Sequence, residues 1–194
     1  MITELAGYTS GILIFISFIP YIRDIFRGKT KPERGSWLIW TILGSIAFFS
    51  QFAKGASYSL FLAGIQGLGD LFVFLLSIKY GFSRLLKRDK IAILGAGISL
   101  VLWYFTKEAA TALFLVIIID GIGGILTIVK SYEAPATETL STWILTGISG
   151  FFAMIAVGSF NFILLAFPIY IFLINFAIVA AVKLGSRYNL KAQN

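Results

Sequence analysis

The stretch Ala109-Ala-Thr-Ala-Leu-Phe-Leu-Val-Ile-Ile-Ile-Asp-Gly-Ile-Gly-Gly-Ile-Leu-Thr-Ile-Val-Lys130 decides the fold class. It is nearly continuous in apolar residues and long enough for one α-helix to cross a bilayer core about 30 Å thick. Its apolar positions do not alternate with a period of two, and in hydrocarbon only helices or closed barrels satisfy every backbone amide. We therefore predict a membrane-spanning helix with a carboxylate, Asp120, near its centre.

Six further apolar stretches of spanning length fill the rest of the chain. Of its 194 residues, 58% are hydrophobic and only 13% are charged, and the mean hydropathy is +0.91. That leaves too few polar side chains to coat a soluble globule of this size. We expect an all-α membrane protein in which residues 1–194 form a single transmembrane domain. Its seven transmembrane helices are predicted at approximately 6–26, 35–54, 57–79, 90–106, 109–130, 140–158 and 160–183.

The residue types that are absent exclude several function classes. The chain has no cysteine and no histidine. This removes disulfides, thiolate and imidazole metal sites, haem ligation and Ser-His-Asp chemistry. Nor does any nucleophile pair or metal cluster stand at a recognisable spacing. We expect no enzyme, no metal and no cofactor.

The basic residues predict the orientation of the chain. Of the 16 Lys and Arg residues, 14 fall on one side of the predicted helices: those between 23 and 34, between 79 and 90, at 130 and between 183 and 191. Only Lys54 and Lys107 fall on the other side. By the positive-inside rule the amino terminus is outside and the carboxyl terminus is cytoplasmic, in a plasma or inner membrane. We read the net charge of +7 as orientation and contact with anionic lipid, so the expected partner is the bilayer and not nucleic acid.

The chain also contains an internal repeat. With Trp37 placed over Trp143, an offset of 106 residues, Phe18-Ile-Pro-Tyr-Ile-Arg aligns with Gly124-Ile-Leu-Thr-Ile-Val. The third helices follow at a slightly smaller offset. This predicts repeat one at 6–79, a linker helix at 90–106 without a counterpart, and repeat two at 109–183. Because the second repeat starts after an even number of crossings, the two repeats run parallel, which favours a two-fold axis along the membrane normal with a central cavity.

These features resemble those of the PQ-loop superfamily, which includes the SWEET and SemiSWEET sugar transporters. The resemblance rests on the three-plus-one-plus-three arrangement, on Pro20 followed by a polar residue, and on a basic loop leading to a helix with Trp37 and Trp40. It implies a seven-helix transporter with a central solute site. Of the hinge prolines it implies, only Pro20 is carried over, and the membrane asparagine of the family matches Asn175. Tyr21 replaces the family's glutamine, and the second repeat has Leu126-Thr127 without a proline, so a four-proline hinge does not follow. In the first repeat Gln66 or Asp70 stands where the family has an amide, so a sugar substrate does not follow either.

Two carboxylates in apolar stretches are the strongest candidates for a functional site. Asp70 and Asp120 lie near the centres of their predicted helices, whereas every other acid falls at a helix end or in a loop. A charged side chain at the bilayer centre costs at least about 2.5–3.5 kcal/mol, so such acids face a cavity, find a partner or stay protonated. No Lys, Arg or His lies near the centre of a predicted span to neutralise them. A proton, a cation, a cationic part of the substrate, or hydrogen bonds from Gln66, Thr127 and Asn175 remain, as does a purely structural role in joining helices.

Other candidate residues have alternative interpretations. Trp40 and Trp143 belong either to an interfacial aromatic belt or to the floor of the cavity. Tyr170 and Asn175 can supply neutral hydrogen bonds, although an amide also commonly joins membrane helices. Pro20, Gly123 and Gly124 are either hinges or sites of a static kink and close packing.

Together these observations lead us to expect a transporter of a small polar solute that works by alternating access, with or without a coupled proton. A channel, or a receptor or sensor of the same fold that binds its ligand without moving it, stays open as an alternative. A homo-oligomer also stays open.

Overall fold

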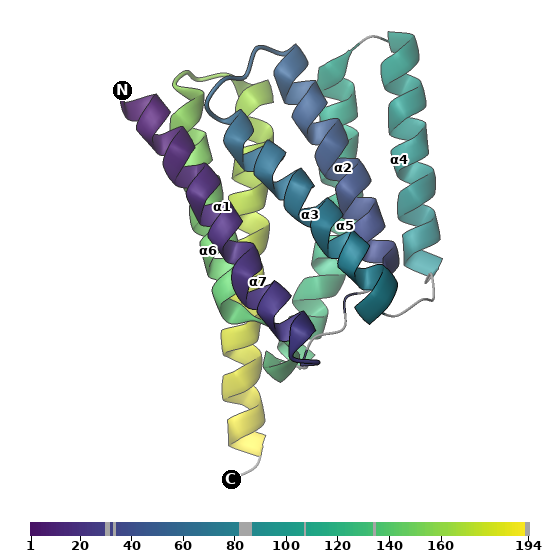
Figure 1. Cartoon of the computed structure of the whole chain (residues 1–194), viewed down its shortest axis with the longest axis vertical. Coiled ribbons are helices and arrows are strands. Elements are labelled where there is room, and N and C mark those ends of the chain that lie inside the picture. Colours follow the sequence, from purple (N-terminus) through teal and green to yellow (C-terminus); the bar gives the residue numbers. More distant parts are fainter. Residues whose placement is uncertain (30–31, 33, 82–86, 107, 134, 193–194) are drawn as a thin grey trace.

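The protein folds into a bundle of α-helices (Figure 1). The structure is a computed structural model, and it describes residues 1–29, 32, 34–81, 87–106, 108–133 and 135–192. Within these ranges the elements are α1 (Ile2–Phe26), α2 (Arg34–Ala53), α3 (Leu60–Tyr80), α4 (Lys87–Thr106), α5 (Ala109–Glu133), the 3-10 turn η1 (Pro135–Thr137), α6 (Leu140–Val157) and α7 (Phe162–Ala192). Each predicted apolar stretch forms one of the seven helices, which confirms the all-α fold class.

Local sequence signals explain where several helices begin and end. Gly28, Gly55 and Gly158 follow the ends of α1, α2 and α6, and all three have positive φ angles of 69°, 81° and 69°. Glycine adopts this left-handed conformation without a steric penalty, which is why it commonly stops a helix. At the start of α7, the Asn161 side chain accepts hydrogen bonds from the backbone N–H groups of Ile163 and Leu164 at 3.0 and 3.2 Å. This caps amides that have no partner within the helix.

Among the described residues, four helices are long and apolar enough to cross a membrane: Ile2–Phe26, Leu60–Tyr80, Leu140–Val157 and Phe162–Tyr188. Shorter apolar segments occupy Trp37–Ala53 and Ala110–Gly121. Large apolar side chains such as Phe15 and Leu68 point away from the bundle, with 63% and 68% of their surface exposed. A surface of this kind is stable against lipid tails and not against water. The chain is an integral membrane protein.

Two groups of three helices have the same pattern of internal contacts. In the first group α3 lies between α1 and α2, and in the second α7 lies between α5 and α6. The groups meet along two lines of contact, α1 against α6 and α2 against α5. The remaining helix, α4, lies at the edge of the bundle against α5 and α2 (Figure 1). We call the group of α1–α3 the first unit and the group of α5–α7 the second unit.

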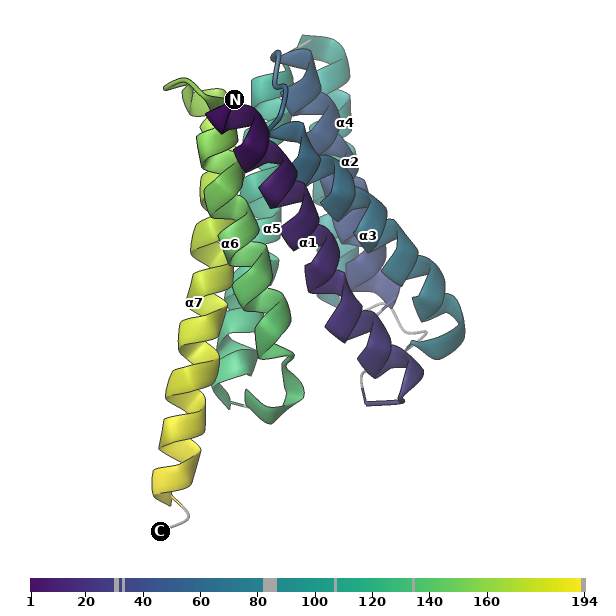
Figure 2. The same cartoon turned by 60° about the vertical axis from the view of Figure 1, so that its left-hand side comes forward.

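The two ends of the bundle differ. Met1 and the carboxyl terminus lie at opposite ends, which we call the amino end and the carboxyl end (Figure 1). Figure 2 shows the two units close together at the amino end and spread apart toward the carboxyl end.

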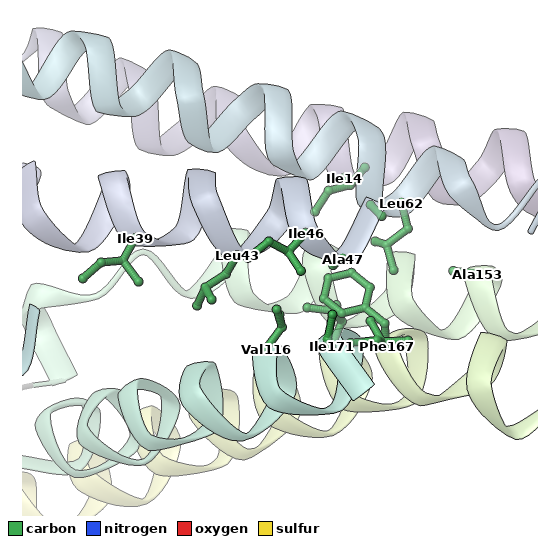
Figure 3. Close-up of a cluster of buried hydrophobic side chains, with 13 residues drawn as sticks. Ile14, Ile39, Leu43, Ile46, Ala47, Leu62, Val116, Ala153, Phe167 and Ile171 are labelled. Atoms are coloured by element: carbon green, nitrogen blue, oxygen red, sulfur yellow. The ribbon is translucent and has the colours of Figure 1, made fainter. Parts of the chain in front are cut away.

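The buried clusters follow this difference. A large cluster takes residues from both units, among them Ile14, Leu43, Leu62, Val116 and Phe167 (Figure 3). A second cluster, built on Ile25, Trp37 and Val73 with neighbours from the same three helices, belongs to the first unit alone. Apolar contacts therefore join the units in the part of the bundle nearer the amino end.

Candidate functional site

Asp120 is the centre of the candidate site. It lies midway along α5, and its Oδ2 atom accepts a hydrogen bond of 2.7 Å from the Tyr170 hydroxyl on α7. The Trp40 side chain on α2 lies beside the same carboxylate, with the indole N–H as its one donor. Because α2 belongs to the first unit and α5 and α7 to the second, this carboxylate lies at the contact between the two units.

Small residues on α5 leave room for Tyr170. A Cβ atom added to Gly124 would lie 3.6 Å from the Tyr170 hydroxyl and 2.6 Å from Cδ1 of Ile174. At Gly121 the same atom would lie 3.9 Å from the tyrosine ring. Gly124 thus lets α7 approach α5 closely enough for Tyr170 to reach Asp120. The surroundings of Gly123, the other glycine predicted as a hinge, lie outside the described residues.

Asp70 lies close to this site from the first unit. It is at the centre of α3, only 5% exposed, and near enough to Asp120 for the two carboxylates to interact electrostatically. A Cβ atom on Gly44 would lie 3.2 Å from Cα of Gly67 and 3.6 Å from Oδ2 of Asp70, so α2 and α3 cross tightly beside it. Two negative charges repel strongly where little water surrounds them, and a proton or a cation relieves that repulsion.

A line of aromatic rings connects this site with the half of α1 that lies nearer the carboxyl end. The Tyr21 and Trp37 ring centroids are 5.1 Å apart, and those of Trp37 and Trp40 are 4.9 Å apart. Phe18 joins the line at 6.4 Å from Trp37 and lies against Gly69, where a side chain would collide with its ring. These rings place Trp40 beside Asp120 and fix the wall of the site on the side of the first unit.

The structure therefore brings together four of the predicted site residues, Asp70, Asp120, Trp40 and Tyr170, which we call the acid cluster. Asn175 is 4% exposed and bonds within its own helix, its Nδ2 donating to the Ile171 carbonyl at 2.8 Å. Gln66 lies one turn before Asp70. Both amide oxygens are buried and make no hydrogen bond among the residues that the structure describes.

Three other predicted residues lie away from the acid cluster. Trp143 donates its indole N–H to Glu138 Oε2 at 3.0 Å, which anchors the start of α6. Thr127 lies two turns beyond Asp120 on α5, toward the carboxyl end, and Pro20 lies inside α1. None of the predicted site residues lines the shallow groove of about 480 Å³ between α5 and α7, whose walls include Ile128, Tyr132, Ala177 and Ala181.

Two sets of contacts between the units were missed by the sequence analysis. The Lys54 ammonium and the Glu108 carboxylate form an ion pair of 3.0 Å at the amino end. Ser10 on α1 and Ser149 on α6 are fully buried against each other, with their hydroxyl oxygens 3.1 Å apart. The two residues of the ion pair are 54 residues apart in sequence and the two serines are 139 apart, so no local sequence pattern connects either pair.

Among the described residues, no group of three or more acidic side chains is placed to hold a metal ion.

We also compared the chain with known proteins. No protein-family model, no curated protein and no solved structure matches the chain.

Proposed function

We propose that the protein is a membrane transporter that moves a small polar solute by alternating access. The observation that carries the proposal is the acid cluster, in which Asp120 of the second unit lies beside Trp40 and within electrostatic range of Asp70, both of the first unit. Ionisable groups inside a membrane protein are costly and mark substrate, ion or proton pathways. A site shared by two bodies changes when the bodies move, which is what coupling of binding to transport requires.

The contact pattern supports two parallel three-helix repeats with α4 as the linker. In both units the third helix lies between the other two, and the units meet through equivalent pairs, α1 with α6 and α2 with α5. A two-fold axis that relates the units predicts this exchange of first and second helices. On this basis we propose seven membrane spans in the three-plus-one-plus-three arrangement, and kinship with the PQ-loop superfamily.

The differences between the two ends support a state that is closed at the amino end. The buried cluster shared by the units includes Leu62 and Ala63 on α3 and Ala112 and Leu113 on α5. The two acids lie seven residues beyond these positions, which is about 10 Å along a helix. The apolar layer thus lies between the acid cluster and the amino end.

A direct test is uptake of solutes into proteoliposomes. A thermal-shift screen of purified protein against sugars, amino acids, polyamines and vitamins selects the solute, and its uptake is then followed with and without an imposed proton gradient. Saturable uptake with counterflow supports the transporter. Single-channel currents would favour a channel, and binding without uptake would favour a receptor or sensor.

The orientation that we propose can be checked with single cysteines, because the chain has none of its own. The positive-inside rule places the amino end outside and the C-terminal tail in the cytoplasm. In intact cells, an impermeant maleimide is expected to label Ser57→Cys, in the exposed α2–α3 link, and not Gln193→Cys. If Gln193→Cys is labelled and Ser57→Cys is protected, the protein has the opposite orientation to the one proposed.

Pro20 is expected to serve motion more than stability. Proline has no amide hydrogen, so the Ile16 carbonyl lacks its usual helical partner and α1 is weakened at this point. Pro20→Ala should restore that bond, leave the melting temperature equal or higher, and slow uptake. Ile19→Ala, which removes an exposed neighbour instead, is the control for local changes in α1. An uptake rate equal to that of the parent would assign Pro20 to a static kink.

A further inference from the structure

The contact between α1 and α6 is held by hydrogen bonds along its length. The Ser10 hydroxyl lies 2.9 Å from the Ser149 carbonyl oxygen, and the Ser149 hydroxyl lies 2.8 Å from the Ser10 carbonyl oxygen. Two turns further along α1, the Ser17 carbonyl accepts a bond of 3.1 Å from the Thr142 hydroxyl. A step of seven residues on α1 thus matches a step of seven on α6, so the two antiparallel helices stay in register. We call this contact the serine seam.

The contact between α2 and α5 is built differently, and we call it the acid seam. Its buried part contains Leu43 and Val116, which project into the same apolar cluster (Figure 3). On the side of the carboxyl end Trp40 meets Asp120, and at the amino end Lys54 meets Glu108. The ion pair is exposed to solvent, with 29% and 59% of the two side chains accessible.

The repeat offset makes the two seams directly comparable. Shifted by 106 residues, Ser10 falls on Val116, and Ser149 falls on Leu43. Asp120 likewise corresponds to Ile14, and Trp40 to Thr146. At equivalent places, one seam therefore has a hydrogen-bonded pair of serines and the other has an apolar pair. The ionisable group is present in only one of them.

These chemistries give different costs of separation. Parting the serine seam would take the partners from two hydroxyl groups that are now fully buried in an apolar surrounding. Parting the acid seam exposes carbon atoms, which lipid or a solute can cover. It also separates Trp40 from Asp120, whose carboxylate keeps the hydrogen bond from Tyr170 within the second unit, and it parts an ion pair that water can replace at its exposed end. The acid seam is therefore the easier one to open.

We propose that, in the transporter described above, the solute passes along the acid seam while the serine seam stays closed and acts as the hinge. The passage of a solute in this inference rests on the proposed function, whereas the opening of one seam about the other does not. It differs from a symmetric rocking of the two units, in which both seams would open equally. It also assigns the Lys54–Glu108 ion pair as the latch of the path at the amino end.

Cysteine pairs at equivalent places test the path. Ser10→Cys with Ser149→Cys crosslinks the serine seam, and Leu43→Cys with Val116→Cys crosslinks the acid seam, in a chain free of other cysteines. After oxidation, uptake by the serine-seam pair is expected to stay near that of its reduced form. Uptake by the acid-seam pair should fall to the background of protein-free liposomes and return with reductant. Equal loss in both pairs, or loss in the serine-seam pair alone, would overturn the proposal.

A distance measurement tests the motion without any transported solute. Spin labels are placed at the amino ends of the two seams, on Phe52→Cys with Thr111→Cys, which leaves the Lys54–Glu108 ion pair intact, and on Thr3→Cys with Ser159→Cys, in lipid nanodiscs. We expect a broad or two-component distance distribution for the acid seam and a single narrow one for the serine seam. Equal widths, or a wider distribution for the serine seam, would contradict the hinge even if uptake is observed. If no solute is transported but the distributions differ as expected, the proposed function fails and the hinge stands.

Discussion

Asp120→Asn is expected to remove the dependence of uptake on pH, or to lower uptake by about tenfold or more, which corresponds to a loss of about 1.4 kcal/mol. The asparagine keeps the shape of the side chain and can still accept the hydrogen bond from Tyr170, but it cannot ionise. If Asp120 binds a proton or a substrate cation, the loss of charge removes that step. The variant should fold as well as the parent, or better, because no charge has to be kept from water.

Three further variants separate this role from a structural one. Asp70→Asn removes the other charge of the acid cluster, and Tyr170→Phe removes the hydrogen bond while keeping the ring. Glu133→Gln changes an exposed acid at the end of α5 and is the control. The hypothesis of proton coupling would be excluded if uptake had the same pH profile in the parent, in Asp120→Asn, in Asp70→Asn and in the double variant. A facilitator of a neutral solute would then be the surviving form of the transporter.

Gly150→Ala is expected to lower the free energy of unfolding by about 1–3 kcal/mol, the usual cost of forcing an atom into a filled interior. The new Cβ atom would lie 2.8 Å from the Phe172 nitrogen and 3.0 Å from the Pro168 carbonyl oxygen. Both are backbone atoms of α7, so α6 and α7 would have to move apart. A lower melting temperature of the purified protein in detergent is the measurement.

Gly97→Ala is the matched control for this substitution. Gly97 also lies inside a helix, α4, but a Cβ atom there meets nothing within 4 Å. Replacing a helical glycine by alanine in open space stabilises by about 0.5–1 kcal/mol, so the melting temperature should stay equal or rise. Equal shifts for the two variants would mean that α6 and α7 are not as close as described.

The helices themselves could be predicted from the sequence because hydrocarbon leaves the backbone few alternatives. Most boundaries agree within about three residues, the usual uncertainty of such predictions. The main differences are at α7 and at α1, which begins at Ile2 and not at 6. The predicted last helix ends at 183, but α7 continues to Ala192, because polarity alone does not stop a helix once its backbone is bonded internally. α3 begins at Leu60 and not at 57, since the residues before it form a turn after Gly55.

The candidate site could be predicted only in part. Asp70 and Asp120 are conspicuous because a carboxylate within an apolar run is costly wherever the run lies. Periodicity shows which residues share a face of one helix, but not which other helix that face meets. For this reason the sequence leaves Trp40 open between a belt and a cavity floor, and its place beside Asp120 follows only from the α2–α5 contact. A serine within each of two apolar runs, Ser10 and Ser149, was the available signal for the serine seam.

Helix α7 is longer than the membrane is thick, so a small tilt of this helix moves its far end by a large distance. A helix of 31 residues is about 46 Å long, whereas the hydrocarbon core is about 30 Å thick. The part nearest the carboxyl terminus projects beyond the other helices (Figure 1). A tilt of only about 10° over that length displaces its tip by about 8 Å. A fluorophore attached at this tip would magnify small rotations of the second unit into readable displacements, with no label in the path itself.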